Sequence, residues 1–152
     1  MKATWMIAVC GCLAIGGANA ALAADEPDKI LSYRQNVMKS VGANITNIAA
    51  VAKGEISDTR NVAANARAIR DGLQMAAPLF PAGTGKEAGK TRALPSIWED
   101  TPKFVDSLKA SQAAAEDMIV AGETNDLGEI RKAIGALGKT CGGCHDDFRE
   151  EQ

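Results

Sequence analysis

The sequence predicts an all-α protein, an antiparallel four-helix bundle, on three observations. Apolar residues recur at steps of three and four along four stretches of the chain, as they do on the buried face of a helix. Glycine, proline and cap residues mark the ends of these stretches. The sequence has no apolar alternation long enough for a strand and no internal repeat. One long connection, over residues 78–100, separates the second helix from the third.

The first 23 residues have the pattern of a secretory signal peptide. A lysine gives the positive start, residues 5–15 form a short apolar core, and small residues follow. Cleavage after Ala23 is favoured over cleavage after Ala20, because a polar segment then begins the mature chain. We therefore expect residues 1–23 to be removed and residues 24–152 to form one domain.

The first two helices are bounded by turn and cap residues. The first is expected over 28–53, because Gly54 is a natural C-terminal glycine. The second is expected to start near Ser57 or Asp58, both good caps, and to end at Pro78. Their apolar stripes consist of Ile30, Val37, Val41, Ile45, Ile48 and Ala52 in the first helix and Val62, Ala66, Ile69, Leu73 and Ala76 in the second.

The last two helices follow the long connection. Thr101 is expected to cap the third, with Pro102 at its first position and Gly122 at its end. Thr124 or Asn125 is expected to cap the fourth. The last stripe runs unbroken to the C-terminal end, so we expect all its members to face the interior. The stripes are Phe104, Val105, Leu108, Ala115, Met118 and Ile119, then Leu127, Ile130, Ile134, Leu137, Cys141, Cys144 and Phe148.

The fourth helix carries Cys141-Gly-Gly-Cys144-His145, the pattern of a covalent c-type haem attachment site. Two thiols three residues apart lie on one helix face about a turn apart, which suits addition to the two vinyl groups of a porphyrin edge. His145 is the only histidine in the chain, so it has no rival as an imidazole ligand. We therefore predict one haem c, attached through Cys141 and Cys144, with His145 as an axial ligand of the iron.

Three other interpretations of these cysteines are weaker. A thioredoxin-like dithiol wants a strand and a βαβ unit around it, whereas the surroundings here are helical. A structural zinc site needs four ligands, and the other cysteines, Cys10 and Cys12, fall in the signal segment. A plain disulfide between Cys141 and Cys144 is the simplest alternative for an exported protein.

Composition excludes several classes of function. The chain has 17 basic and 19 acidic side chains, a net charge of −2, without the basic stripe of a nucleic-acid-binding protein. The apolar run at the N-terminus is too short for stable membrane insertion. No acid–base pair or nucleophile constellation stands out, so we do not expect an enzyme.

A helical bundle with its haem motif at the C-terminal end resembles the class II c-type cytochromes, the cytochrome c′ family. The resemblance covers essentially the whole mature chain. It includes Tyr33-Arg34-Gln35 in the first helix, Pro95-Ser96-Ile97-Trp98 before the third, and the segment from Cys141 to Arg149.

The resemblance implies that the residue opposite His145 decides the function. It places Met38 at the distal position, four residues after Arg34 on the same helix face. A thioether bound to the iron raises the reduction potential and closes the iron to gases, as in the low-spin cytochrome c-556 type. The alternative is that Met38 only fills the core. Met75 and Met118 are expected in the core.

The resemblance also assigns roles to charged and aromatic side chains. Arg34 is expected to pair with a haem propionate, the alternative being a solvated surface charge. Arg149 is expected near the proximal imidazole, the alternative being a plain helix-end charge. Trp98 is expected either at the haem edge or as an anchor of the loop. A terminal acidic run could orient a basic redox partner; it consists of Asp146, Asp147, Glu150 and Glu151.

The sequence therefore predicts a low-spin electron-transfer haem protein in the periplasm of a Gram-negative bacterium, with redox proteins as partners. The alternative is a five-coordinate cytochrome c′ that binds nitric oxide or carbon monoxide. Pairing of two copies through the first two helices, as in some family members, is compatible with either reading. Nucleic acid is not an expected partner.

Overall fold

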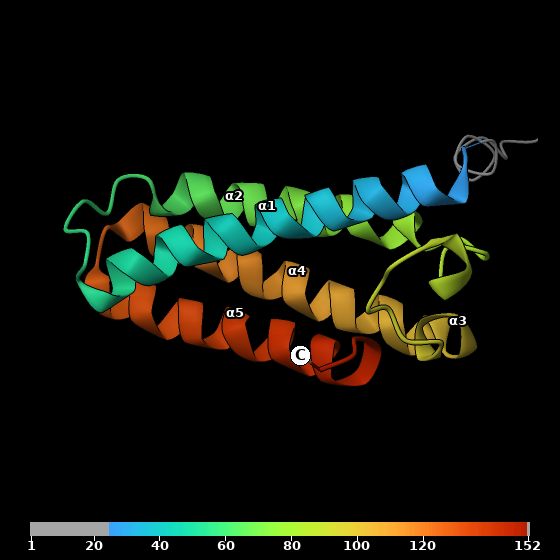
Figure 1. Ribbon diagram of the computed structural model, residues 1–152. Helices are drawn as coiled ribbons and strands as arrows, with labels where there is room; N and C mark the ends of the chain where they lie inside the picture. The colour runs from blue at the N-terminus through green and yellow to red at the C-terminus, as the bar shows by residue number, and fades with distance from the viewer. Residues whose placement is uncertain (1–24, 152) are drawn as a thin grey trace, which may run out of the picture.

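The computed structural model describes residues 25–151, and every regular element among them is helical (Figure 1). Four long helices run alternately in opposite directions and pack side by side as an antiparallel bundle, as predicted. They are α1 (Pro27–Lys53), α2 (Val62–Ala76), α4 (Thr101–Thr124) and α5 (Leu127–Phe148). The proposed signal peptide, with Cys10 and Cys12, lies outside the described residues.

The long connection between α2 and α4 holds three short elements that the sequence analysis missed. They are the 3-10 turns η2 (Ala77–Leu79) and η3 (Lys86–Ala88) and the four-residue helix α3 (Ser96–Glu99). Each is too short to show an apolar period, so periodicity could not reveal it. No helix among residues 25–151 is both long and apolar enough to cross a membrane.

Two helix ends differ by a residue or two from the prediction. The N-cap of α4 is Asp100, whose carboxylate accepts a hydrogen bond from the Lys103 backbone N–H at 3.1 Å, and Thr101 is already helical. The N-cap of α5 is Asp126, which accepts from the Glu129 N–H at 2.9 Å. A carboxylate at each position faces the positive end of the helix dipole, and this favours aspartate over the neighbouring threonine.

The N-cap of α2 is Asn61, so the cap predicted at Ser57 or Asp58 was three to four residues too early. Asp58 does not cap the helix, because its carboxylate accepts hydrogen bonds from the backbone N–H and the guanidinium of Arg60. This local turn satisfies Asp58 outside the helix, and α2 begins only at Val62. By contrast, Gly54 ends α1 in the left-handed conformation as expected, with φ of 80°.

The bundle is held together by three close helix pairs: α1 with α2, α2 with α4, and α4 with α5. Two glycines allow the closest approaches. A Cβ on Gly72 of α2 would lie 2.6 Å from Val41 Cγ2 of α1, and one on Gly122 of α4 would lie 2.6 Å from the Ala63 backbone nitrogen of α2. The fully buried side chains at these contacts include Ile48, Ile69, Met118, Ile130 and Leu137.

The two core methionines predicted from sequence have different positions. Met118 is fully buried between helices, as expected. Met75 is 47% exposed, so its assignment to the core was wrong. It lies on the outward face of the last turn of α2, where neighbours no longer cover it.

Candidate haem site

The two motif cysteines lie on the last turns of α5 with both thiols free. They are half-buried and pack against the core cluster, although Ile130, Leu137 and Phe148 on the same helix are fully buried. The inward stripe predicted for this helix is therefore correct in direction. Its cysteine end stays accessible enough for a large group to be attached there.

Burial controls the state of both thiols. It raises the pKa of Cys141, opposed by hydrogen bonds with Thr140 and Ser111. Burial, with the nearby Cys141 and Asp147, raises the pKa of Cys144 to about 11. Both groups are therefore neutral thiols near pH 7 in the folded chain. Neither has the lowered pKa of a redox-active dithiol, which argues against the thioredoxin-like interpretation.

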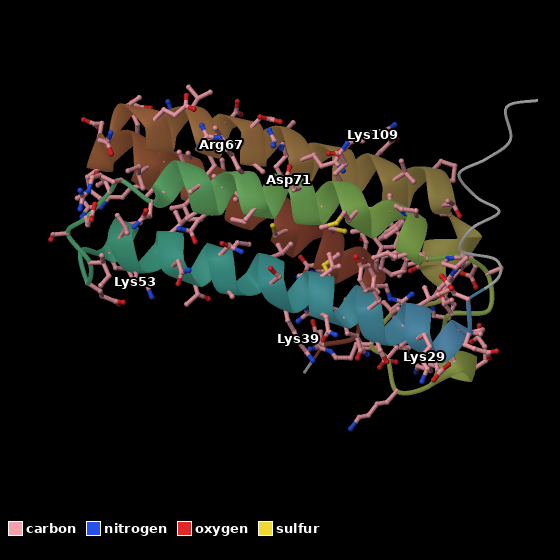
Figure 2. All side chains as sticks on the ribbon, turned by 90° about the horizontal axis from the view of Figure 1, so that it is seen from above. Lys29, Lys39, Lys53, Arg67, Asp71 and Lys109 are labelled. Atoms are coloured by element: carbon pink, nitrogen blue, oxygen red, sulfur yellow. The ribbon has the colours of Figure 1, made fainter. Side chains whose placement is uncertain are left out.

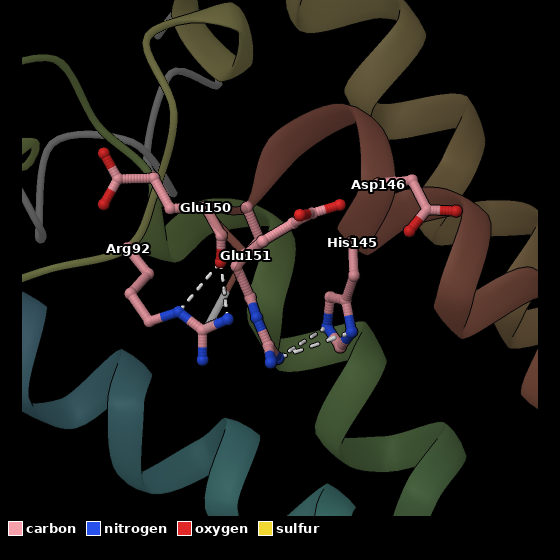
Figure 3. A pocket seen from close by; sticks show the side chains of 6 residues that line it. Arg92, His145, Asp146, Glu150 and Glu151 are labelled. Atoms are coloured by element: carbon pink, nitrogen blue, oxygen red, sulfur yellow. Dashed lines mark hydrogen bonds between the residues drawn. The ribbon is translucent and has the colours of Figure 1, made fainter.

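His145 is exposed and borders a small pocket at the C-terminal end of α5 (Figure 3). The Arg149 Nη1 atom lies 3.4 Å from the imidazole Nδ1 and 3.5 Å from Nε2. The proximity predicted for Arg149 and His145 is therefore present. Desolvation of the covered side of the ring lowers the pKa of His145, and the guanidinium groups of Arg149 and Arg92 lower it further. A neutral imidazole is the form that binds a metal.

The long connection holds the end of α5 in place through residues that the sequence analysis missed. Leu94 donates its backbone N–H to the Phe148 carbonyl at 3.0 Å, and Glu150 donates to the Arg92 carbonyl at 2.8 Å. The Arg92 side chain also binds the Glu150 carbonyl oxygen (Figure 3). Arg149 is thereby held in an extended conformation beside His145. Pairing between segments so distant in sequence leaves no local signal.

Opposite α5, one stripe of α1 stays half-buried where its neighbours are fully buried. Met38, Ile45 and Ala52 recur every seven residues and pack against the core without being covered. This stripe faces α5, because the carbonyl of Ala52 accepts a hydrogen bond from Arg131 Nε of α5 at 2.7 Å. We call this boundary the α1–α5 seam. It comprises Met38, Ile45 and Ala52 of α1 and Ile134, Cys141 and Cys144 of α5.

The bond between Ala52 and Arg131 fixes the level at which the two helices meet. Met38 precedes Ala52 by fourteen residues, and His145 follows Arg131 by fourteen residues. Because α1 and α5 run in opposite directions, both residues lie about 21 Å along their helices on the same side of that bond. Met38 and His145 are therefore at about the same height on the seam.

The residues of the seam fit a covalently held haem. Two free thiols one turn apart stand beside a histidine, and half-exposed apolar side chains of α1 face them. The α1–α5 contact is sparse compared with the other three neighbouring pairs, so a flat apolar group can lie between these helices.

Arg34 is buried, with only 3% of its surface exposed, so the alternative of a solvated charge was wrong. Its Nη1 donates to the Leu79 carbonyl at 3.0 Å and to Thr84 Oγ1 at 3.1 Å, and its Nη2 donates to the Thr84 carbonyl at 2.8 Å. Its guanidinium also lies over the Phe80 ring, 4.3 Å from the centroid. Three of its five N–H groups thus hold the long connection. Contact of the other two with a propionate stays a prediction.

Trp98 acts as an anchor of the loop, the second of its two expected roles. Its indole N–H lies 3.0 Å from the Phe80 carbonyl and 3.1 Å from the Pro81 carbonyl. Its ring belongs to an aromatic cluster with Phe80, Phe104 and Phe148. The cluster ties the long connection to the helix that carries the haem motif.

Comparison with known proteins decides the family. A family model described as Cytochrome C' matches residues 29–149, from the start of α1 to just beyond the haem motif. The chain belongs to the cytochrome c′ family. Cytochrome c′ of Rhodopseudomonas palustris is 38% identical to it over 81% of this chain and 83% of that protein. The cytochrome c′ crystal structure from Rubrivivax gelatinosus matches with a TM-score of 0.76 and 29% identity, covering 83% and 98% of the two chains.

Membership in the cytochrome c′ family confirms the cofactor prediction, a haem c held covalently by Cys141 and Cys144. It does not support the narrower prediction of a methionine-ligated c-556 type. The similar proteins are named cytochrome c′ and, at 30% identity over 82% of each chain, cytochrome c-554 of Cereibacter sphaeroides. The similar structures include a nitric oxide complex of an Alcaligenes xylosoxidans cytochrome c′ variant, at 26% identity and a TM-score of 0.75 over 83% and 98% of the chains.

Proposed function

We propose that this cytochrome c′ binds nitric oxide or carbon monoxide at its haem iron, on the side facing α1. The supporting observation is the apolar character of the seam on that side, where Met38 and Ile45 are half-buried and the chain has no second histidine. Haem supplies the iron that binds the gas. An apolar surface without hydrogen-bond donors beside the iron would favour small neutral ligands that need no polar stabilisation. Nitric oxide complexes of similar cytochromes c′ support the same assignment.

In this proposal each residue of the site has a separate role. Cys141 and Cys144 would hold the haem covalently, and His145 would supply an imidazole ligand to its iron. Arg149 keeps a positive charge beside that imidazole. Met38 and Ile45 exclude water from the opposite side, so a gas meets an apolar surface there.

A second candidate is electron transfer with Met38 as the sixth ligand. The observation that favours it is the matched height of Met38 and His145 across the seam. A thioether opposite an imidazole raises the reduction potential and blocks gas binding. The two candidates therefore make opposite predictions for the same chain.

Addition of carbon monoxide to the dithionite-reduced haem protein tests the proposal. The gas-binding function predicts a changed Soret absorption in the wild type and a similar change in Met38→Leu. The electron-transfer candidate predicts no change in the wild type and new carbon monoxide binding in Met38→Ala. Met75→Leu is the matched control, because Met75 is exposed and off the seam. If carbon monoxide leaves the Soret absorption of the reduced wild type unchanged, the gas-binding proposal is refuted.

We further propose that the protein works in the periplasm, as its N-terminal sequence predicts. Fractionation of the native host tests this, together with the N-terminal sequence of the purified haem protein. Recovery of the haem protein in the cytoplasmic fraction with residues 1–23 intact would contradict it.

A further inference from the structure

The charged side chains in the middle of α1 and of α5 are of one sign. Between Asp28 and Glu55 the chain has no acidic residue, and between Glu129 and Asp146 it again has none. The exposed charged side chains of these two stretches are all basic. We define the basic face by five of them, exposed on the two helices that form the seam: Lys39, Lys53, Arg131, Lys132 and Lys139.

The positive charge of these two stretches is opposite in sign to the net charge of the whole protein, which is −2. On α2 and α4 the basic side chains have acidic partners. Arg67 pairs with Glu123, and Arg70 pairs with Asp71 and Glu116. The basic side chains of α2 and α4 are thus neutralised locally, unlike those in the middle of α1 and α5. The basic face therefore creates a local positive potential, although the net charge of the protein is negative.

The basic face is also largely unneutralised. Lys39, Lys132 and Lys139 have no acidic group within 4.0 Å among the residues that the structure describes, and Lys53 only just reaches Glu55 at 4.0 Å. Arg131 donates to a carbonyl, which leaves its charge uncompensated. These charges are free to act on a partner.

The five side chains are distributed along the length of the two helices that form the seam. Because the helices are antiparallel, Lys53 is level with Arg131 and Lys132 at one end, and Lys39 is level with Cys144 at the other. Lys139 lies between them on α5. Figure 2 shows Lys39 and Lys53 along the outer side of α1, with Arg67 and Lys109 on the opposite side of the bundle.

We propose that the basic face docks an acidic patch of an electron-donating or electron-accepting protein, which exchanges electrons with the haem held at the seam. Complementary charge would steer the partner to the two helices that flank the cofactor. The predicted alternative surface, the acidic terminal run, is weaker, because Asp147 pairs with Lys103 and Glu150 pairs with Lys86 inside the chain. This inference rests on the family's haem and applies to both functions proposed above.

A small anionic oxidant measures the local field directly. One electron passes from ferrous haem iron to hexacyanoferrate(III), which becomes hexacyanoferrate(II), and no bond forms or breaks. If the basic face controls access, the oxidation rate of the wild-type haem protein falls roughly tenfold as ionic strength rises from about 10 mM to about 500 mM. If the net negative charge controls access, the rate rises, and this result overturns the proposal.

Two charge-reversed variants separate the local field from the total charge. Lys39→Glu with Lys139→Glu should abolish the fall in rate or invert it. Arg67→Glu with Lys109→Glu changes the net charge by the same amount on the far side, so it should keep the wild-type salt dependence. Equal behaviour of the two variants overturns the proposal. Gas binding plays no part in this assay, so failure of the gas-binding function leaves the result interpretable.

The class of partner is tested with the same wild-type protein. Poly-L-glutamate should slow the reaction with hexacyanoferrate(III) in the wild type and leave the Lys39→Glu, Lys139→Glu variant unaffected. If phosphatidylglycerol vesicles bind the protein and poly-L-glutamate does not, the partner of the basic face is a lipid surface and not an acidic protein. If sedimentation equilibrium finds a salt-sensitive dimer that the Lys39→Glu, Lys139→Glu variant does not form, the partner is a second copy of this chain. Either result overturns the choice of partner.

Discussion

Replacing Arg34 by methionine should destabilise the protein by about 2–4 kcal/mol. Methionine keeps most of the apolar stem of the side chain, so the loss reports on the guanidinium. The change leaves the carbonyl oxygens of Leu79 and Thr84 buried without their donor. Each such group costs about 1–3 kcal/mol, and the contact with the Phe80 ring adds about 0.5–2 kcal/mol. Relief from burying a charge, which lowers the pKa of Arg34, offsets part of the sum.

Guanidinium chloride unfolding of the haem protein, followed by far-ultraviolet circular dichroism, measures this loss. In a separate thermal unfolding experiment followed by the same signal, the expected fall in the midpoint temperature is roughly 10 °C for a domain of this size. Arg34→Lys should lie between the wild type and Arg34→Met, because an ammonium cannot reproduce the fork that binds both residues of the loop. Arg60→Met is the matched control, since Arg60 is exposed and binds only Asp58; its unfolding midpoint should not change resolvably.

An Arg34→Met variant as stable as the Arg60→Met control would refute the reasoning. The hydrogen bonds of Arg34 to the long connection would then contribute nothing net, and the loop would be held by Trp98 and the aromatic cluster alone. Equal losses in Arg34→Lys and Arg34→Met would instead show that the planar geometry of the guanidinium is essential.

Helix contacts and cofactor attachment give three further predictions. Gly122→Ala should cost about 1–3 kcal/mol, because its Cβ would meet the α2 backbone, and Gly72→Ala should cost less, because the Val41 side chain can move. Gly135→Ala, whose Cβ meets no protein atom, should gain about 0.5–1 kcal/mol; an equal loss at all three glycines in urea unfolding would contradict the packing argument. Intact-mass spectrometry of the exported protein should find one added haem, and none after Cys141→Ser with Cys144→Ser. A haem mass that survives the double change would exclude thioether attachment.

The helices were predictable because their signals are local. The apolar period of each long helix and the left-handed Gly54 depend only on neighbours within a turn or two. The caps were less predictable, because adjacent threonine and aspartate both accept hydrogen bonds, and the outcome at Asp100 depends on one residue of register. The role of Asp58 was missed because its partner, Arg60, competes with the helix for the carboxylate.

The haem motif was predictable for the same reason, since two thiols and a histidine within one turn of helix need no tertiary contact to be recognised. Sequence by itself therefore determined the cofactor, the residues that hold it, and the class of fold. Only the tertiary structure decided that Arg34 is buried against Thr84 and that Arg92 holds the end of α5. These contacts join segments 50 and 58 residues apart, and such pairings depend on how the helices stack rather than on any local pattern.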